Sequence, residues 1–163
     1  RNIQTSYDAC SKEEILMTLG IKPSSPNTGY GYIQFKEDSS EIKEVKQFTE
    51  KPNLEKAQEF LDQGDYLWNA GIFVWSAKSI IKAFKEHLPD MYAIFEKGAD
   101  SWNTLKEQDF IDKNYSKSEN ISIDFGIIEK AINVQVLPVE FGWNDLGTWG
   151  SLHDKKAKKK STI

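Results

Sequence analysis

Apolar residues gather in short runs along the chain, and the run that dominates the pattern covers residues 66–75, YLWNAGIFVW. Its length and its aromatic and β-branched content predict a strand buried on both faces. An unpaired amide in such a strand costs about 1–3 kcal/mol. Asn69 therefore either satisfies backbone groups inside the fold or faces a ligand at the strand's end. The small residues Ala70 and Gly71 would let a ligand approach the backbone closely, which favours the second interpretation.

Four more segments have the composition or the alternation of strands and are bounded by turn-forming residues. They are residues 15–21, a glycine-spaced turn from residue 28 that runs into a strand ending near Phe35, residues 42–48, and residues 134–141. The alternation in 42–48 predicts a half-exposed strand. Pro138 places the end of the last strand at a sheet edge or a bulge.

Helical spacing of apolar residues fills the segments between these strands. We expect helices over residues 1–14, from an Asn53 cap to Gly64, from a Ser76 cap to Pro89, from an Asp90 cap to Gly98, over 101–115, from a Ser122 cap through Ala131, and after the loop 142–149. Strands and helices alternate, so the predicted fold class is α/β. The chain has 163 residues and no long linker, which predicts one domain over residues 1–163.

Charge and cysteine content narrow the function classes. The net charge of −4 argues against general nucleic-acid binding, which needs a basic surface. Cys10 is the single cysteine, so no internal disulfide forms and a reducing, cytoplasmic setting is expected. No apolar run approaches the ~18–20 residues of a membrane span, so no membrane partner is expected. The chain opens on Arg1 rather than on Met, and we expect it to begin inside a longer protein.

Four clusters in the sequence could carry chemistry. The first is the turn Thr28-Gly29-Tyr30-Gly31-Tyr32, and the third is Asn69 with Gly71, described above. Its two glycines could bring backbone N–H groups to a ligand, or the turn could simply pack its tyrosines on the sheet.

The second cluster is Glu50-Lys51-Pro52, which follows the strand at 42–48. A carboxylate can accept from sugar hydroxyls and a lysine can pair with a phosphate, although an adjacent Glu-Lys pair is also common on plain surfaces.

The fourth cluster is the loop Trp143-Asn144-Asp145-Leu146-Gly147. Asp145 is a candidate Mg²⁺ ligand, since Mg²⁺ takes one or two carboxylates together with substrate phosphates. Asn and Asp before Gly also form ordinary turns. Asp124 is a lesser candidate, because its position suits a charge at a helix N-terminus.

Six segments, in this order and spacing, resemble the mannose-1-phosphate guanylyltransferases: TLGIKP (18–23), TGYGYI (28–33), FTEKP (48–52), WNAGIFVW (68–75), SIDFGIIEK (122–130) and FGWNDLGTW (141–149). The resemblance covers nearly the whole chain. It implies membership of the wider sugar-nucleotide pyrophosphorylases, whose fold is a Rossmann-like mixed α/β sheet flanked by helices.

The resemblance also implies roles for individual residues. Glu50 would hold sugar hydroxyls, Lys51 the sugar 1-phosphate, and Gly31 and Asn69 would line the sugar pocket. Asp145 would bind the catalytic Mg²⁺. In such enzymes a phosphate oxygen of mannose 1-phosphate attacks the α-phosphorus of GTP, and GDP-mannose and pyrophosphate form. The chemistry needs positioning and charge neutralisation by the metal and by Lys51.

Two parts of the family pattern are not found in these residues: the arginine-containing glycine-rich loop that cradles the nucleotide, and a second metal-binding aspartate. The chain therefore resembles the second, sugar-binding half of the catalytic domain, and we expect no turnover by this polypeptide alone. GTP and mannose rest on the resemblance. Another hexose-1-phosphate nucleotidyltransferase, a non-catalytic sugar-phosphate-binding module and a purely structural domain stay open. So does the oligomeric state, with a homo-oligomer among the alternatives.

Overall fold

A computed structural model of the protein describes residues 1–145 and 153. Its strands close into one barrel in the order β1-β4-β2-β3-β5. These are β1 (Leu16–Ile21), β2 (Tyr32–Phe35), β3 (Lys43–Thr49), β4 (Tyr66–Trp75) and β5 (Val134–Pro138). β1 and β5 run parallel, and every other described pairing is antiparallel. The predicted α/β class with a mixed sheet is confirmed, while the closure of the sheet by a short β3–β5 pairing was not foreseen.

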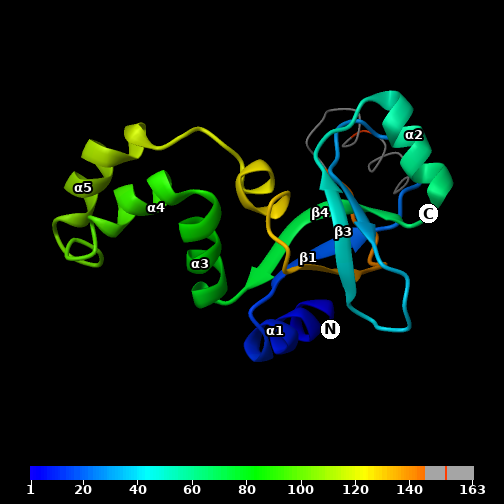
Figure 1. Ribbon diagram of the computed structural model, residues 1–163, viewed down its shortest axis with the longest axis horizontal. Coiled ribbons are helices and arrows are strands. Elements are labelled where there is room, and N and C mark those ends of the chain that lie inside the picture. The colour runs from blue at the N-terminus through cyan, green and yellow to red at the C-terminus, as the bar shows by residue number, and fades with distance from the viewer. Residues whose placement is uncertain (146–152, 154–163) are drawn as a thin grey trace.

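Helices flank this sheet on several sides (Figure 1). They are α1 (Asn2–Lys12), α2 (Leu54–Gln63), α3 (Ala77–His87), α4 (Pro89–Glu96), α5 (Glu107–Asn114), the 3₁₀ turn η1 (Tyr115–Lys117) and the π-helical turn η2 (Asp124–Ile128). The α3–α5 group lies on one side of the sheet and α2 on the opposite side (Figure 1). No helix in the described part of the chain is long and apolar enough to cross a membrane.

Two predicted caps are present as expected. The Asn53 side chain accepts from the N–H of Lys56 at 2.9 Å, and Gly64 ends the same helix in the left-handed region with a φ of 81°. The Ser76 hydroxyl accepts from the N–H of Ser79 at 3.0 Å at the start of α3. These local signals were sufficient because each cap is satisfied within its own turn.

Three helix predictions were wrong in detail. Asp90 is not a cap: α4 begins at Pro89, which tolerates the first helical position because it has no N–H to satisfy. The helix expected over 101–115 begins only at Glu107. The segment after Ser122 forms the π turn η2 instead of an α-helix, although the Ser122 hydroxyl accepts from the N–H of Phe125 at 3.4 Å, as expected of the predicted cap.

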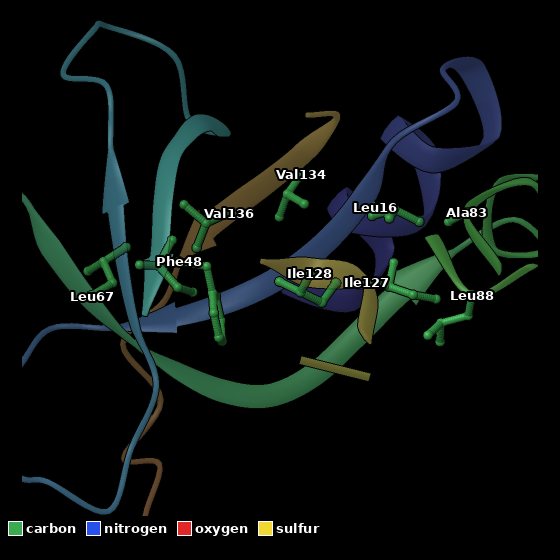
Figure 2. Close-up of a cluster of buried hydrophobic side chains, with 10 residues drawn as sticks. Leu16, Phe48, Leu67, Ala83, Leu88, Ile127, Ile128, Val134 and Val136 are labelled. Atoms are coloured by element: carbon green, nitrogen blue, oxygen red, sulfur yellow. The ribbon is translucent and has the colours of Figure 1, made fainter. Parts of the chain in front are cut away.

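The largest core cluster lies between the sheet and the α3–η2 side (Figure 2). Leu16, Phe48, Leu67, Val134 and Val136 come from strands, and they meet Ala83, Leu88, Ile127 and Ile128 (Figure 2). Two smaller clusters lie beneath α1 and α2. The packing of Ile127 and Ile128, which are 0% and 2% exposed, fixes η2 against the sheet.

Burial of β4 on both faces is confirmed only for its first half. Tyr66, Leu67 and Trp68 are buried, whereas residues 72–75 are partly exposed. The difference follows from the pairing, because β2 pairs with β4 only at these first three residues, while β1 follows β4 to its end.

Candidate functional site

A cavity of about 480 Å³ lies where β2, β3 and β4 meet the loop that follows β5. Its lining includes a residue from each of the four predicted clusters: Gly31, Glu50, Asn69 and Asp145. Asp124, from η2, completes the set of polar groups that the structure brings together there. The volume lies within the range of small-molecule sites.

Gly31 leaves room for the acidic wall of the cavity. A Cβ atom at this position would lie 2.5 Å from Oε2 of Glu50 and 2.9 Å from Cζ of Phe48. The carbonyl of Gly31 accepts from the N–H of Asn69 at 2.8 Å, so the same residue also ties β2 to β4. Space therefore favours glycine here, because an added Cβ atom would have to displace the Glu50 carboxylate and the Phe48 ring.

The turn at Glu50 and Lys51 is held by its backbone. The N–H of Glu50 donates to Oε1 of Glu129 at 3.2 Å, and the N–H of Lys51 donates to the carbonyl of Tyr30 at 3.2 Å. Lys51 has a φ of 45°, a left-handed conformation that a non-glycine residue adopts only under constraint. Such strain is commonest at functional sites.

The side chains of this turn face different surroundings. Nζ of Lys51 lies 2.7 Å from Oε1 of Glu50, and this hydrogen bond raises the pKa of Lys51. The Glu50 side chain is 8% exposed and that of Lys51 is 60% exposed. Glu50 lines the cavity, whereas Lys51 lies beside it in contact with solvent. The ammonium group is thus accessible to a phosphate outside the cavity wall.

The first interpretation of Asn69, satisfaction of groups inside the fold, is confirmed, while its contact with a ligand stays a prediction. Its Oδ1 accepts from the Thr18 hydroxyl at 2.8 Å and from the N–H of Gly71 at 3.1 Å. Its Nδ2 donates to Oδ1 of Asp124 at 3.0 Å, and the residue lines the cavity. The amide is therefore satisfied in the fold and also available to a ligand.

Asp124 was underrated from the sequence, where its position suggested a helix-terminal charge. Burial raises the pKa of its carboxyl group, and the negative charge of Glu50 raises it further. Its contact with Asn69 spans 55 positions of the chain. No local pattern predicts such a contact, and the only sequence signal was its place in the segment SIDFGIIEK.

Aromatic rings form the side of the cavity next to Asp145. Tyr30 packs edge-to-face on Trp68 and Trp143, with ring centroids 5.0 Å and 5.2 Å apart. Burial raises the pKa of Tyr30, and the charge of Asp145 adds to this effect. Asp145 thus lies near the aromatic wall, while Leu146 and Gly147 of the same loop lie outside the described residues.

A magnesium site at Asp145 stays a prediction. Among residues 1–145 and 153, no group of three or more His, Cys, Asp or Glu side chains is arranged to hold a metal ion. Mg²⁺ needs only one or two carboxylates when water and substrate phosphates supply its other ligands. The hard oxygen donors in this cavity fit that requirement.

Comparisons with known proteins agree with the motifs. Mannose-1-phosphate guanylyltransferase of Escherichia coli is 35% identical over 154 residues, which cover 90% of this chain and 33% of that protein. The protein of the same name from Sinorhizobium fredii (strain NBRC 101917 / NGR234) is 39% identical over 141 residues, 84% of this chain and 27% of that one. The chain thus spans about a third of the length of the curated relatives it matches.

A solved structure shows the same likeness in three dimensions. The crystal structure described as mannose-1-phosphate geranyltransferase from Thermus thermophilus superposes with a TM-score of 0.80 at 31% identity, over 94% of this chain and 43% of that one. The resemblance inferred from six motifs is confirmed. The family model described as "Nucleotidyl transferase" matches residues 4–162, and the chain therefore belongs to the nucleotidyl transferase family.

Proposed function

We propose that this chain is the sugar-phosphate-binding part of a mannose-1-phosphate guanylyltransferase, which forms GDP-mannose and pyrophosphate from mannose 1-phosphate and GTP. The observation that carries the proposal is the cavity lined jointly by Gly31, Glu50, Asn69 and Asp145. The names of the relatives support the choice of mannose 1-phosphate and of guanosine as the nucleoside.

The polar groups of the cavity suit a hexose 1-phosphate. Glu50 offers acceptors to ring hydroxyls, and Asn69 offers an amide next to a second carboxylate. Lys51, with its exposed ammonium group, would bind the phosphate as a point charge. Sugar and phosphate would then be held by neighbouring residues of one turn, which orients the phosphate relative to the ring.

Asp145 would hold Mg²⁺ together with substrate phosphates. Bound there, the ion would neutralise phosphate charge during transfer of the nucleotidyl group. The part played by the protein would be to position the sugar phosphate and to keep Lys51 next to its oxygens.

Isothermal titration of the 163-residue chain with mannose 1-phosphate, glucose 1-phosphate and inorganic phosphate tests the proposal. We expect mannose 1-phosphate to bind most tightly. Lys51→Ala should weaken its binding about 10- to 100-fold, the usual worth of a charge-assisted hydrogen bond. Glu50→Gln should weaken the binding of mannose 1-phosphate more than that of inorganic phosphate, because Glu50 is proposed to contact the sugar, whereas it affects the phosphate only through its ion pair with Lys51.

Lys36→Ala is the matched control, since Lys36 is also exposed and also paired with a glutamate, Glu44, on the β2–β3 hairpin. This variant should bind mannose 1-phosphate as the wild type does. Equal losses in Lys36→Ala and Lys51→Ala would contradict a specific phosphate contact. Tighter binding of glucose 1-phosphate would instead favour another hexose-1-phosphate nucleotidyltransferase.

A further inference from the structure

We infer that Asp124 is a specificity-determining residue of the sugar pocket, whose carboxylate accepts a hydrogen bond from a hydroxyl of the bound hexose. This inference rests on the proposed function, because it requires a sugar phosphate in the cavity. It assigns a ligand contact to a residue that was only a lesser candidate from the sequence, because its position suits a helix-terminal charge.

The orientation of the Asn69 amide is the first observation behind this assignment. Two donors, the Thr18 hydroxyl and the N–H of Gly71, fix Oδ1 of Asn69 at 2.8 Å and 3.1 Å. Thr18 is fully buried, so this anchor lies in the core of the barrel. The NH₂ end of the amide must therefore be the end that meets Asp124.

Asn69 and Asp124 together make a donor and an acceptor side by side in the cavity wall. The contact with Asn69 uses one N–H of the amide and one acceptor position of the carboxylate. A second N–H remains on the amide, and a carboxylate accepts about four hydrogen bonds in all. A sugar hydroxyl both donates and accepts. Asn69 could therefore donate to, and Asp124 accept from, the same hydroxyl or two neighbouring hydroxyls.

The π turn η2 connects Asp124 to the other sugar-binding turn. The N–H of Glu129 donates to the carbonyl of Asp124 at 2.9 Å, the five-residue hydrogen bond of a π-helix. In an α-helix, side chains five residues apart would point about 140° apart. The wider π turn brings them closer to one face, and Glu129 accepts from the N–H of Glu50.

One short turn thus contacts Asn69 at one end and Glu50 at the other. Its middle is fixed by burial of Ile127 and Ile128 and by Gly126, where a Cβ atom would lie 2.8 Å from Cδ1 of Leu88. π turns occur frequently at functional sites. A rigid element that joins two ligand-facing residues fits a role in positioning and recognition.

Charge supports the same assignment. Asp124 and Glu50 both line the cavity. Burial raises the pKa of Asp124, the charge of Glu50 raises it further, and the charge of Lys51 lowers it by less. Such an arrangement disfavours the fold without ligand and gains from hydroxyl donors when a polyol binds.

The test compares mannose 1-phosphate with its 2-, 3-, 4- and 6-deoxy analogues by isothermal titration, for wild-type protein and Asp124→Asn. The variant keeps the shape and an acceptor for Asn69 but loses the charge. We expect it to bind mannose 1-phosphate about 10- to 100-fold more weakly. For the deoxy analogue that lacks the contacted hydroxyl, wild type and variant should bind alike.

Asp112→Asn is the matched control, because Asp112 on α5 also accepts from a side-chain amide, that of Gln108 at 2.8 Å, but outside the cavity. It should change no affinity. Should Asp124→Asn fail to fold, Asp124→Glu moves the carboxylate by one methylene and should weaken the parent sugar more than the matching deoxy analogue.

Two results would overturn the inference while the proposed function stands. One is wild-type affinity for mannose 1-phosphate in Asp124→Asn. The other is an equal loss for all analogues, which would mean that Asp124 acts only by positioning Asn69. No binding of mannose 1-phosphate by wild-type protein would overturn the proposed function and this inference together.

Discussion

Replacement of Gly31 by alanine should weaken sugar-phosphate binding while the protein still folds. Its backbone is not in the left-handed region, so an alanine is opposed there by space alone. The new Cβ would lie 2.5 Å from Oε2 of Glu50, 2.9 Å from Cζ of Phe48 and 3.4 Å from Cβ of Asn69. The Glu50 carboxylate is the most mobile of these neighbours and should move first.

The size of the effect follows from these distances. An ordinary contact needs about 3.5 Å, so the Glu50 carboxylate has to move by about 1 Å. Binding groups tolerate only about 0.5 Å of displacement. We therefore expect mannose 1-phosphate to bind about 10- to 100-fold more weakly, the worth of one charge-assisted hydrogen bond. Overpacking should lower the free energy of unfolding by about 1–3 kcal/mol.

Isothermal titration and urea unfolding measure the two effects separately. Gly98→Ala is the matched control, since its Cβ would lie equally close, 2.5 Å, to Cε1 of Phe110, but outside the cavity. It should lose stability and keep its affinity. Wild-type affinity in a folded Gly31→Ala protein would refute the placement of Glu50 in the sugar site.

Three further predictions concern charge. The pKa of Asp124 is raised in the fold above its ordinary 3.8. Its protonated form therefore adds to the free energy of unfolding in full below pH 3.8, and this contribution is lost as the pH rises through the raised pKa. In thermal melts followed by circular dichroism, Asp124→Asn should therefore have a higher Tm than the wild type at about pH 7 and the same Tm below pH 3.8. A lower Tm of the variant at neutral pH would contradict the repulsion from Glu50. Two lysines of α3 lower the pKa of Glu14 to about 2. The ionised carboxylate therefore adds to the free energy of unfolding in full above pH 4.5, and this contribution is lost as the pH falls to about 2. Glu14→Gln should lower the Tm at neutral pH in low salt and much less in about 1 M NaCl; a salt-independent loss would argue against an ion-pair origin. With mannose 1-phosphate present, Mn²⁺ in place of Mg²⁺ should broaden the amide resonances of residues 142–145, and Asp145→Asn should abolish the effect if Asp145 is the ligand.

Features confined to one turn or one strand were readable from the sequence. The caps Asn53 and Ser76 and the helix end at Gly64 are local, and the structure has all three. Glu50 and Lys51 are adjacent in the chain, so their joint presentation at a strand end followed from the strand prediction. The mixed α/β class followed from the alternation of elements.

Features that depend on distant contacts were not readable. Asp124 meets Asn69 across 55 positions, and only the packing of η2 against the sheet brings them together. The apolar spacing at Ile127, Ile128 and Ala131 suits an α-helix as well as a π turn, so periodicity could not separate the two. The decisive packing of Gly126 against Leu88 is tertiary.

The most direct test of a sugar-phosphate site in this cavity is a titration of ¹⁵N-labelled protein with mannose 1-phosphate, followed through its glycine amides. Gly29, Gly31 and Gly71 line the cavity, whereas Gly64 and Gly98 lie outside it. We predict saturable shifts of the first three resonances and none of the last two. Shifts confined to Gly64 or Gly98, or no saturable shift at any of the five, would contradict the account.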